Sequence, residues 1–241
     1  MPADLKRAKL VLVDFRLDHW PERDHQPTLS LKPQNGRALI AVLRSNLPLL
    51  KAEPVAFALN SGVLSDLSRG GGWVGREYAI ARSLDLEWVF GKGGRREGFS
   101  LAVGSLADAV AALPIRWPAS ARLKDKILSL LCVPSKVRWR QSVSEAVDRS
   151  RLPHEILIKN SVGIALLRWL LHEILPFPTF LLDERYLAAR LRMEPGSFSD
   201  RIRSKEGRNI RRALRSFEYR GALRQFAGVR WWRAGIDCSS T

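Results

Sequence analysis

Three apolar segments early in the 241-residue chain each end in side chains that can do chemistry: Asp14, Asn60 with Ser61, and Lys92. An aspartate carboxylate can accept a phosphoryl group, and a neighbouring hydroxyl or amide can contact the phosphate that it acquires. A lysine ammonium can neutralise the charge of that phosphate. If the three segment ends lie together, they form a site for phosphoryl transfer to Asp14.

The pattern of apolar residues predicts the elements that would bring these groups together. Continuous apolar runs predict buried β-strands at residues 9–14, 54–59 and 86–90. Helical spacing of apolar residues predicts helices at 38–43, 78–84 and 105–113. Alternation of strands and helices gives parallel strands joined by right-handed crossovers. Because the carboxyl ends of such strands share one edge of the sheet, we expect Asp14, Ser61 and Lys92 at a single edge.

Four motifs in this segment occur in an order that is typical of one family. They are Leu-Val-Leu-Val-Asp-Phe-Arg-Leu at 10–17, Asn-Gly-Arg-Ala-Leu at 35–39, Pro-Val at 54–55 and Leu-Glu-Trp-Val-Phe-Gly-Lys at 86–92. With these motifs, residues 8–104 resemble the receiver domain of two-component signalling. The resemblance implies that Asp14 is the phospho-acceptor, that Ser61 or Asn60 stands at the switch-hydroxyl position and that Lys92 contacts the phosphate. It also implies a histidine kinase as partner and Mg²⁺ bound with the help of Asp14.

The chain departs from the receiver pattern before residue 9. A complete receiver begins with a strand that ends in paired acidic residues, which hold Mg²⁺, followed by a helix, a second strand and a second helix. The sequence before residue 9 has no room for these elements, so we expect a partial flavodoxin-like sheet. The segment 15–35 is longer than in the family and would place Asp18, Glu22 and Asp24 near the site. Two interpretations stay open: a truncated or miscalled product of a longer reading frame, or a receiver-like remnant used for contacts.

Basic residues are concentrated in the second part of the chain. The formal net charge is +16, and residues 105–241 hold 25 basic and 13 acidic residues. Residues 201–233 alone contain eleven basic residues and two acidic ones. This distribution predicts a polyanionic partner.

The order of elements in the basic segment is also informative. Helices are predicted at 123–133 and 156–175, then a helix capped by Asp183, a turn at 194–196, a helix from Ser197, a helix at 209–219 and a tight β-hairpin at 222–233. Helix, turn, helix and basic hairpin resemble a winged helix, a variant of the helix-turn-helix family. The resemblance implies DNA binding by Arg208, Arg211, Arg212, Arg215, Arg224, Arg230 and Arg233. Trp231 and Trp232 would alternate faces on the hairpin, one in the core and the other stacking on or covering it.

Composition argues against several other classes. Two distant cysteines and four histidines supply neither a disulfide framework nor a zinc-ligand spacing. No run reaches the roughly 18 apolar residues of a membrane span, and the first twelve residues are charged, unlike a signal peptide. The acidic clusters lack a lysine or histidine spaced as in a metal-dependent nuclease. We therefore expect a cytoplasmic protein without a membrane partner and without enzymatic activity.

The expected fold class is an α/β receiver-like domain followed by a mainly α domain that ends in a winged-helix-like module. The expected boundaries are 1–113 for the receiver-like domain, 114–118 for a linker, 119–178 for a helical region and 179–241 for the basic module. The leading hypothesis is a response-regulator-like protein that binds DNA under the control of phosphorylation at Asp14, with Mg²⁺ needed only in that case. The alternative is an adaptor or scaffold whose unphosphorylated receiver-like domain docks protein partners.

Overall fold

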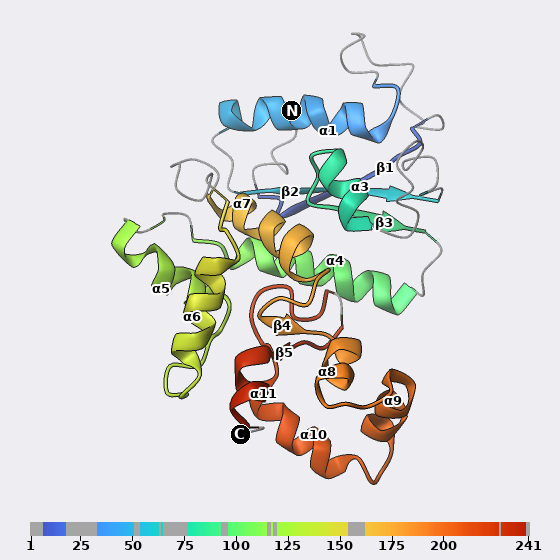
Figure 1. The fold of residues 1–241 in the computed structure, drawn as a ribbon. Helices are drawn as coiled ribbons and strands as arrows, with labels where there is room; N and C mark the ends of the chain where they lie inside the picture. The colour runs from blue at the N-terminus through green and yellow to red at the C-terminus, as the bar shows by residue number, and fades with distance from the viewer. Residues whose placement is uncertain are drawn as a thin grey trace. The chain divides into compact units, whose positions relative to one another are not determined.

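The computed structural model of the chain describes residues 7–17, 33–50, 54–62, 64, 77–92, 96–114, 117, 120–153, 162–226 and 228–239. The chain divides into two compact units, residues 1–115 and 116–241 (Figure 1). The division falls within the predicted linker, and the second unit includes both the helical region and the basic module. Among the described residues, no helix combines the length and the apolar character needed to span a membrane.

The first unit is built on a parallel sheet of three strands. They are β1 (Leu10–Asp14), β2 (Ala56–Ser61) and β3 (Trp88–Gly91), in the order β1-β2-β3. The register pairs Val13 with Leu59 and Leu59 with Val89. The prediction of a parallel α/β sheet from three apolar runs is therefore confirmed, although no specific fold is established by it.

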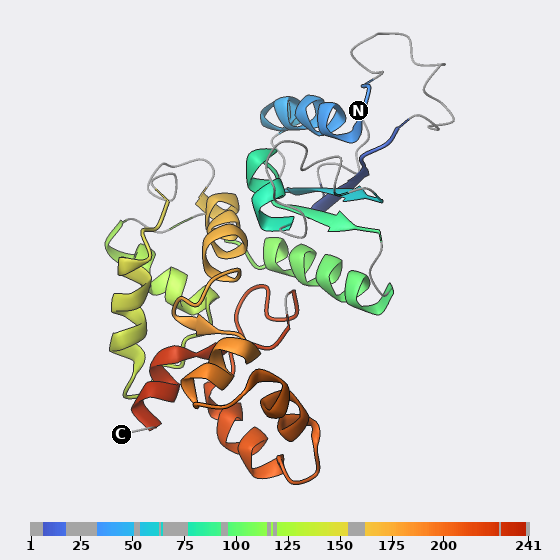
Figure 2. The ribbon, with the colours of Figure 1, turned by 45° about the vertical axis from the view of Figure 1, so that its right-hand side comes forward.

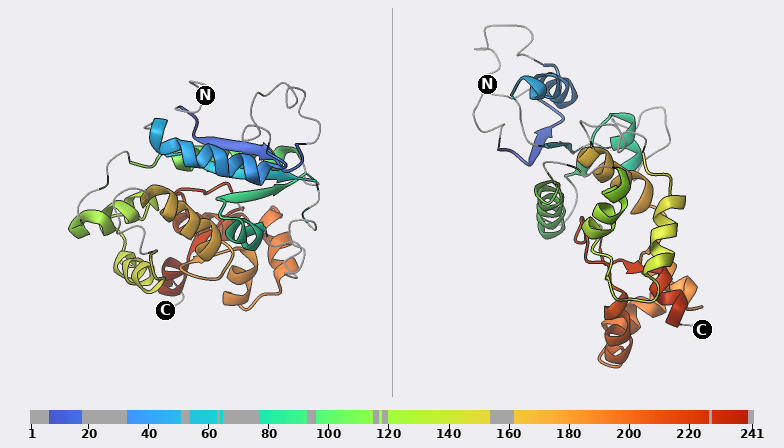
Figure 3. Two further views of the ribbon diagram at one scale, coloured as in Figure 1. Left: turned by 90° about the horizontal axis from the view of Figure 1, so that it is seen from above. Right: turned by 90° about the vertical axis from the view of Figure 1, so that its left-hand side faces the viewer.

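Helices cover both faces of this sheet. They are α1 (Gly36–Leu50), α3 (Glu77–Ser83) and α4 (Arg96–Ala111). Ile40 of α1 and Ile80 of α3 share one core with Val13, Leu59 and Val89 of the strands. Helices α1 and α4 lie on opposite faces (Figure 2), and α1 runs along the strands when the unit is seen from above (Figure 3).

Helix α4 begins earlier than the predicted residue 105. Residues 96–104 of the helix include Gly98, Gly104 and a Leu101 side chain that is 55% exposed, so the apolar spacing that predicts a helix is weak there. Phe99 nevertheless contacts Phe90 of β3 edge to face, with ring centroids 5.4 Å apart. That contact anchors the early part of the helix to the sheet.

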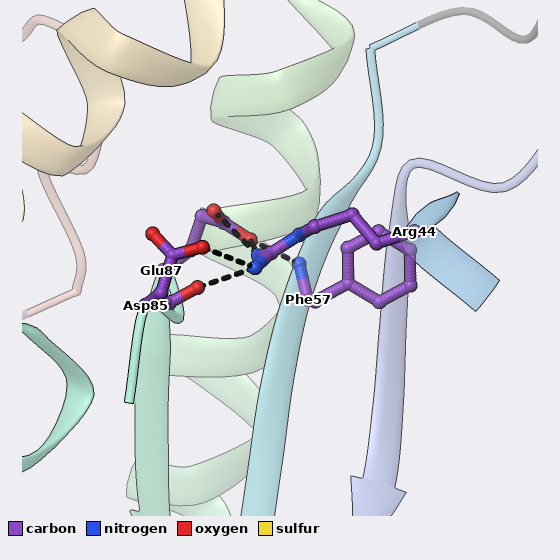
Figure 4. Close-up of polar contacts among 4 residues, drawn as sticks. All are labelled: Arg44, Phe57, Asp85 and Glu87. Atoms are coloured by element: carbon purple, nitrogen blue, oxygen red, sulfur yellow. Dashed lines mark hydrogen bonds and ion pairs between the residues drawn. The ribbon is translucent and has the colours of Figure 1, made fainter. Parts of the chain in front are cut away.

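The fully buried Glu87 anchors the amino ends of the strands. Its carboxylate accepts a hydrogen bond from the Phe57 amide, and both of its oxygens lie 3.2 Å from Nη2 of Arg44. Nη1 of Arg44 also donates to the Asp85 carboxylate at 3.0 Å, and the guanidinium lies 5.1 Å from the Phe57 ring centroid (Figure 4). A buried carboxylate is tolerated when it is paired and hydrogen-bonded in this way. The network ties α1 to β2 and to the start of β3.

The second unit is mainly helical. Its helices are α5 (Ser120–Leu130), α6 (Arg140–Arg149), α7 (Val162–Trp169), a π-helical turn (Leu170–Ile174), α8 (Glu184–Arg190), α9 (Pro195–Arg203), α10 (Arg208–Leu214), a 3₁₀ turn (Arg215–Phe217) and α11 (Arg233–Ser239). Two short strands, β4 (Leu181–Leu182) and β5 (Trp231–Trp232), pair antiparallel. Of the predicted helix 156–175, residues 156–161 lie outside the described residues.

The predicted hairpin at 222–233 is wrong. Residues 221–226 form turns, and Leu223 has φ +64°, which is incompatible with an extended strand. The partner of β5 is β4, and between the described residues on the two sides of the loop the pairing is limited to an isolated bridge from Glu218 to Trp231. The chain turns into α11 directly after β5.

The predicted turn at 194–196 is also wrong, because these residues begin α9. Glu194 is the N-cap and its carboxylate accepts a hydrogen bond from the Ser197 amide at 2.6 Å. Pro195 fits the first helical position, where no amide hydrogen is needed. The Ser197 amide holds the pKa of Glu194 below its usual value. The predicted cap of α8 is present, since Asp183 accepts from the Tyr186 amide at 2.8 Å.

Both tryptophans of β5 are buried, so the expectation that one of them stacks on or covers a hairpin is wrong. Trp231 packs in a cluster with Leu182, Phe198 and Leu214. Trp232 faces the other way and contacts an aromatic group made of Trp139, Phe180 and Tyr219. Alternation along the strand is retained, but the protein covers both faces.

Candidate functional site

Asp14 and Lys92 meet at the carboxyl edge of the sheet. Oδ2 of Asp14 lies 2.5 Å from Nζ of Lys92, although β2 separates the two strands. Both side chains are nearly half exposed. Backbone hydrogen bonds hold the strand ends together, from the Phe15 amide to the Asn60 carbonyl and from the Lys92 amide to the Ser61 carbonyl, each at 2.9 Å. The predicted meeting of carboxylate and amine at one edge is therefore present.

Asn60 and Ser61 are placed differently from each other. Asn60 is the register partner of Asp14 and therefore faces the same side of the sheet. Its Oδ1 is buried and has no hydrogen-bond partner among the described residues. Ser61 is 2% exposed and, by alternation, faces the other side with Leu59. The amide, not the hydroxyl, thus shares the face of Asp14.

The start of α1 closes this edge from one side. The Asn35 side chain caps the helix by accepting from the Ala38 amide at 3.0 Å. The Gly36 amide donates to the Phe15 carbonyl at 2.9 Å. A Cβ at Gly36 would lie 2.2 Å from the Asp14 carbonyl oxygen, so only glycine permits this close approach.

The described residues at this edge do not fit Mg²⁺. They supply one carboxylate and one amide oxygen, and Lys92 already neutralises the carboxylate. No group of three histidine, cysteine, aspartate or glutamate side chains suited to a metal occurs in the described parts of the chain. Asp18, Glu22 and Asp24, which the sequence would place nearby, lie outside the described residues.

The second unit contains a groove of about 560 Å³, which we call the arginine groove. Its described lining comes from α9, α10, the 3₁₀ turn and β5 with the residues before it. The lining residues are Ile202, Arg208, Asn209, Arg211, Arg212, Leu214, Arg215, Glu218, Val229 and Trp231. Four of the seven arginines predicted to bind nucleic acid therefore line one groove.

The turn between α9 and α10 brings one wall of the groove close to the other. A Cβ at Gly207 would lie 1.8 Å from the Arg201 carbonyl oxygen, so this approach also requires glycine. The Arg211 guanidinium donates to the carbonyls of Ile202 and Ser204, the latter at 2.8 Å. Arg211 thus ties the end of α9 to α10, whereas the guanidinium of Arg212 forms no hydrogen bond or ion pair with a described residue.

The other three predicted arginines do not line the groove. Arg230 is partly buried, and Nη2 donates to the Leu175 carbonyl at 3.4 Å. Burial lowers the pKa of Arg230 from its ordinary value. Arg233 lies 3.7 Å from Asp237, whose carboxylate also pairs with Arg190 at 2.7 Å. Arg224 is exposed on the turn segment.

The sequence interpretation missed the apolar and amide components of the groove. Asn209 lies between Arg208 and Arg211 on α10, and Val229 stands between Gly228 and Arg230. Both are exposed. The sequence shows an apolar residue between a glycine and an arginine, but the assignment of residues 229–233 to a hairpin strand gave Val229 no role, and its exposure appears only in the structure.

Comparison with protein-family models, with curated proteins and with solved structures found no match to this chain.

Proposed function

We propose that this protein binds DNA through the arginine groove, as a response-regulator-like protein would through its basic domain. The observation that carries the proposal is the convergence of Arg208, Arg211, Arg212 and Arg215 on one groove. Among the described residues that line it, Glu218 is the only acidic one. Such a groove attracts polyanions, and guanidinium groups bind phosphate with paired, charge-assisted hydrogen bonds.

For the first unit we propose a docking role without phosphorylation. The pairing of Lys92 with Asp14 fits either interpretation. Among the described residues, however, the edge supplies one carboxylate and one amide oxygen, too few ligands for Mg²⁺. This shortage of ligands favours the receiver-like remnant over a competent phospho-acceptor. The chain would then act by binding, not by catalysis, with a protein partner at the first unit and DNA at the second.

The test is the salt dependence of DNA binding by the full chain. Arg208, Arg212 and Arg215 are exposed, and each is expected to meet one phosphate. Each phosphate contact changes the slope of log affinity against log salt by about −0.9 for duplex DNA and about −0.7 for a single strand. The three arginines together therefore contribute about −2.7 for a duplex and about −2.1 for a single strand. Fluorescence anisotropy with labelled DNA of either form, at roughly 50 to 200 mM salt, measures this slope.

The variant that replaces these three arginines by alanine should lose that part of the slope. A matched control replaces Lys136, Arg138 and Arg149, which carry the same charge in the same unit but do not line the groove. The control variant should change the salt slope by less than the value expected for one phosphate contact, about 0.9 for a duplex or about 0.7 for a single strand. Equal losses in both variants, or no binding of either DNA form, would overturn the proposal, and binding of polyglutamate alone would favour the adaptor hypothesis.

A further inference from the structure

The arginine groove has an apolar floor as well as a basic rim. Four apolar residues line the groove, and we call them the apolar floor: Leu214 and Trp231 are 8% and 7% exposed, Val229 is 50% exposed and Ile202 is partly buried. Phosphates alone would need only the arginines. An apolar floor between cationic walls suits a ligand that is itself apolar on one side and anionic on the other.

The neighbours of Val229 hold it at the groove. The Arg230 guanidinium donates to the carbonyls of Val229 and Leu175, at 3.3 and 3.4 Å. The Tyr219 amide donates to the Arg230 carbonyl at 2.8 Å. Before it, Gly228 adopts φ +78°, which glycine reaches without strain. The exposed valine is therefore presented by a braced backbone.

The size and shape of the groove indicate which form of nucleic acid would use this floor. Its volume of about 560 Å³ lies within the roughly 300–1,000 Å³ of small-molecule sites. In a duplex the base faces are stacked inside, so they cannot enter a concave apolar site. In a single strand the base faces are free to pack on apolar and aromatic side chains while the backbone follows basic residues.

Two polar residues complete the site. Asn209 offers an amide donor and acceptor, and Glu218 offers an acceptor for an exocyclic amine of a base. Neither is needed for phosphate, and Glu218 would repel one. Resting on the proposed function, we propose that the arginine groove takes the unpaired bases of a DNA single strand, with bases on the apolar floor and phosphates on Arg208, Arg212 and Arg215.

The test compares three labelled ligands with the full chain at about 0.15 M salt. They are a single strand of about 16 nucleotides, its duplex, and an abasic strand with the same phosphates. We expect the single strand to bind at least about tenfold more tightly than either of the others, as base stacking on protein side chains implies. The abasic strand should keep the salt slope, because its phosphates are unchanged.

A single substitution distinguishes the contribution of the apolar floor to DNA binding from that of the arginines. Val229→Ser should weaken single-strand binding several-fold and leave duplex binding unchanged. Leu101→Ser, at an exposed leucine of the first unit, is the matched control and should change neither. Tighter duplex binding, or equal binding of the abasic strand, would overturn this inference while leaving DNA binding intact. Failure to bind any of the three ligands would overturn the proposed function as well.

Discussion

Arg211 and Arg212 are neighbours in α10, and alanine at each position should have different effects. Arg211 donates to the carbonyls of Ile202 and Ser204, so its guanidinium is occupied by the protein. Arg212 lines the same groove and is exposed, and its guanidinium forms no ion pair or hydrogen bond with a described residue. Each substitution removes one positive charge. Any difference between the two variants must therefore come from what each guanidinium contacts.

The expected magnitudes follow from one phosphate contact. Arg212→Ala should reduce the salt slope by about 0.9 with duplex or about 0.7 with a single strand. At about 0.15 M salt this corresponds to a loss of affinity of about fivefold or fourfold. Arg211→Ala should leave the slope nearly unchanged. It should instead destabilise the α9–α10 turn by about 1 kcal/mol, the usual net contribution of an intramolecular hydrogen bond.

Two assays on the full chain separate these outcomes. Fluorescence anisotropy across a salt series gives the slope, and amide hydrogen exchange gives local stability around residues 202–207. Arg211→Lys is a useful third variant, since it keeps the charge but lacks the planar fork that can reach two carbonyls. Equal reductions of the salt slope in Arg211→Ala and Arg212→Ala, or an unchanged slope in Arg212→Ala, would contradict these roles of the two guanidinium groups.

Two further predictions concern the first unit. Glu87→Ala should lower its free energy of unfolding by about 3 kcal/mol, because the Phe57 amide and Arg44 lose a buried carboxylate while Arg44 keeps Asp85. Glu87→Gln should lower the free energy of unfolding by less than Glu87→Ala. Urea titration, with hydrogen exchange of β2 as the readout, measures both losses, and equal losses in the two variants would contradict this prediction. After incubation with acetyl phosphate and Mg²⁺, the wild-type chain and the Asp14→Asn variant should show the same mass. A competent receiver treated in parallel should gain the mass of a phosphoryl group. An Asp14-dependent gain would refute the docking role.

The first unit was largely predictable because its signals are local. A buried parallel strand needs a continuous apolar run, and the runs at β1, β2 and β3 are interrupted by polar residues where the strands end. The meeting of Asp14 with Lys92 then follows from strand order alone. The orientation of Ser61 was not predictable in the same way, since a shift of one residue in register moves a side chain to the other face.

The second unit was less predictable because its decisive contacts join distant parts of the chain. Strand β5 has two residues, too few for a periodic signal, and its partner β4 lies far away in sequence. Local reasoning paired it with the adjacent segment instead, where Leu223 adopts a left-handed conformation. For the same reason the sequence could not distinguish Arg211 and Arg230, which bind backbone carbonyls, from Arg212.

A surface helix that is merely solvated would also carry arginines, but several other surface cations of the second unit have acidic partners. Arg149 lies 4.0 Å from Glu145, Lys124 lies 2.5 Å from Asp148, and Arg190 and Arg233 share Asp237. Each of these four cations has an acidic partner close by in space, and two of the pairs lie one helical turn apart. Residues 208–215 contain four arginines and no acidic residue at all. Uncompensated like charges on one short helix repel one another, and a bound polyanion is the partner that would remove this repulsion.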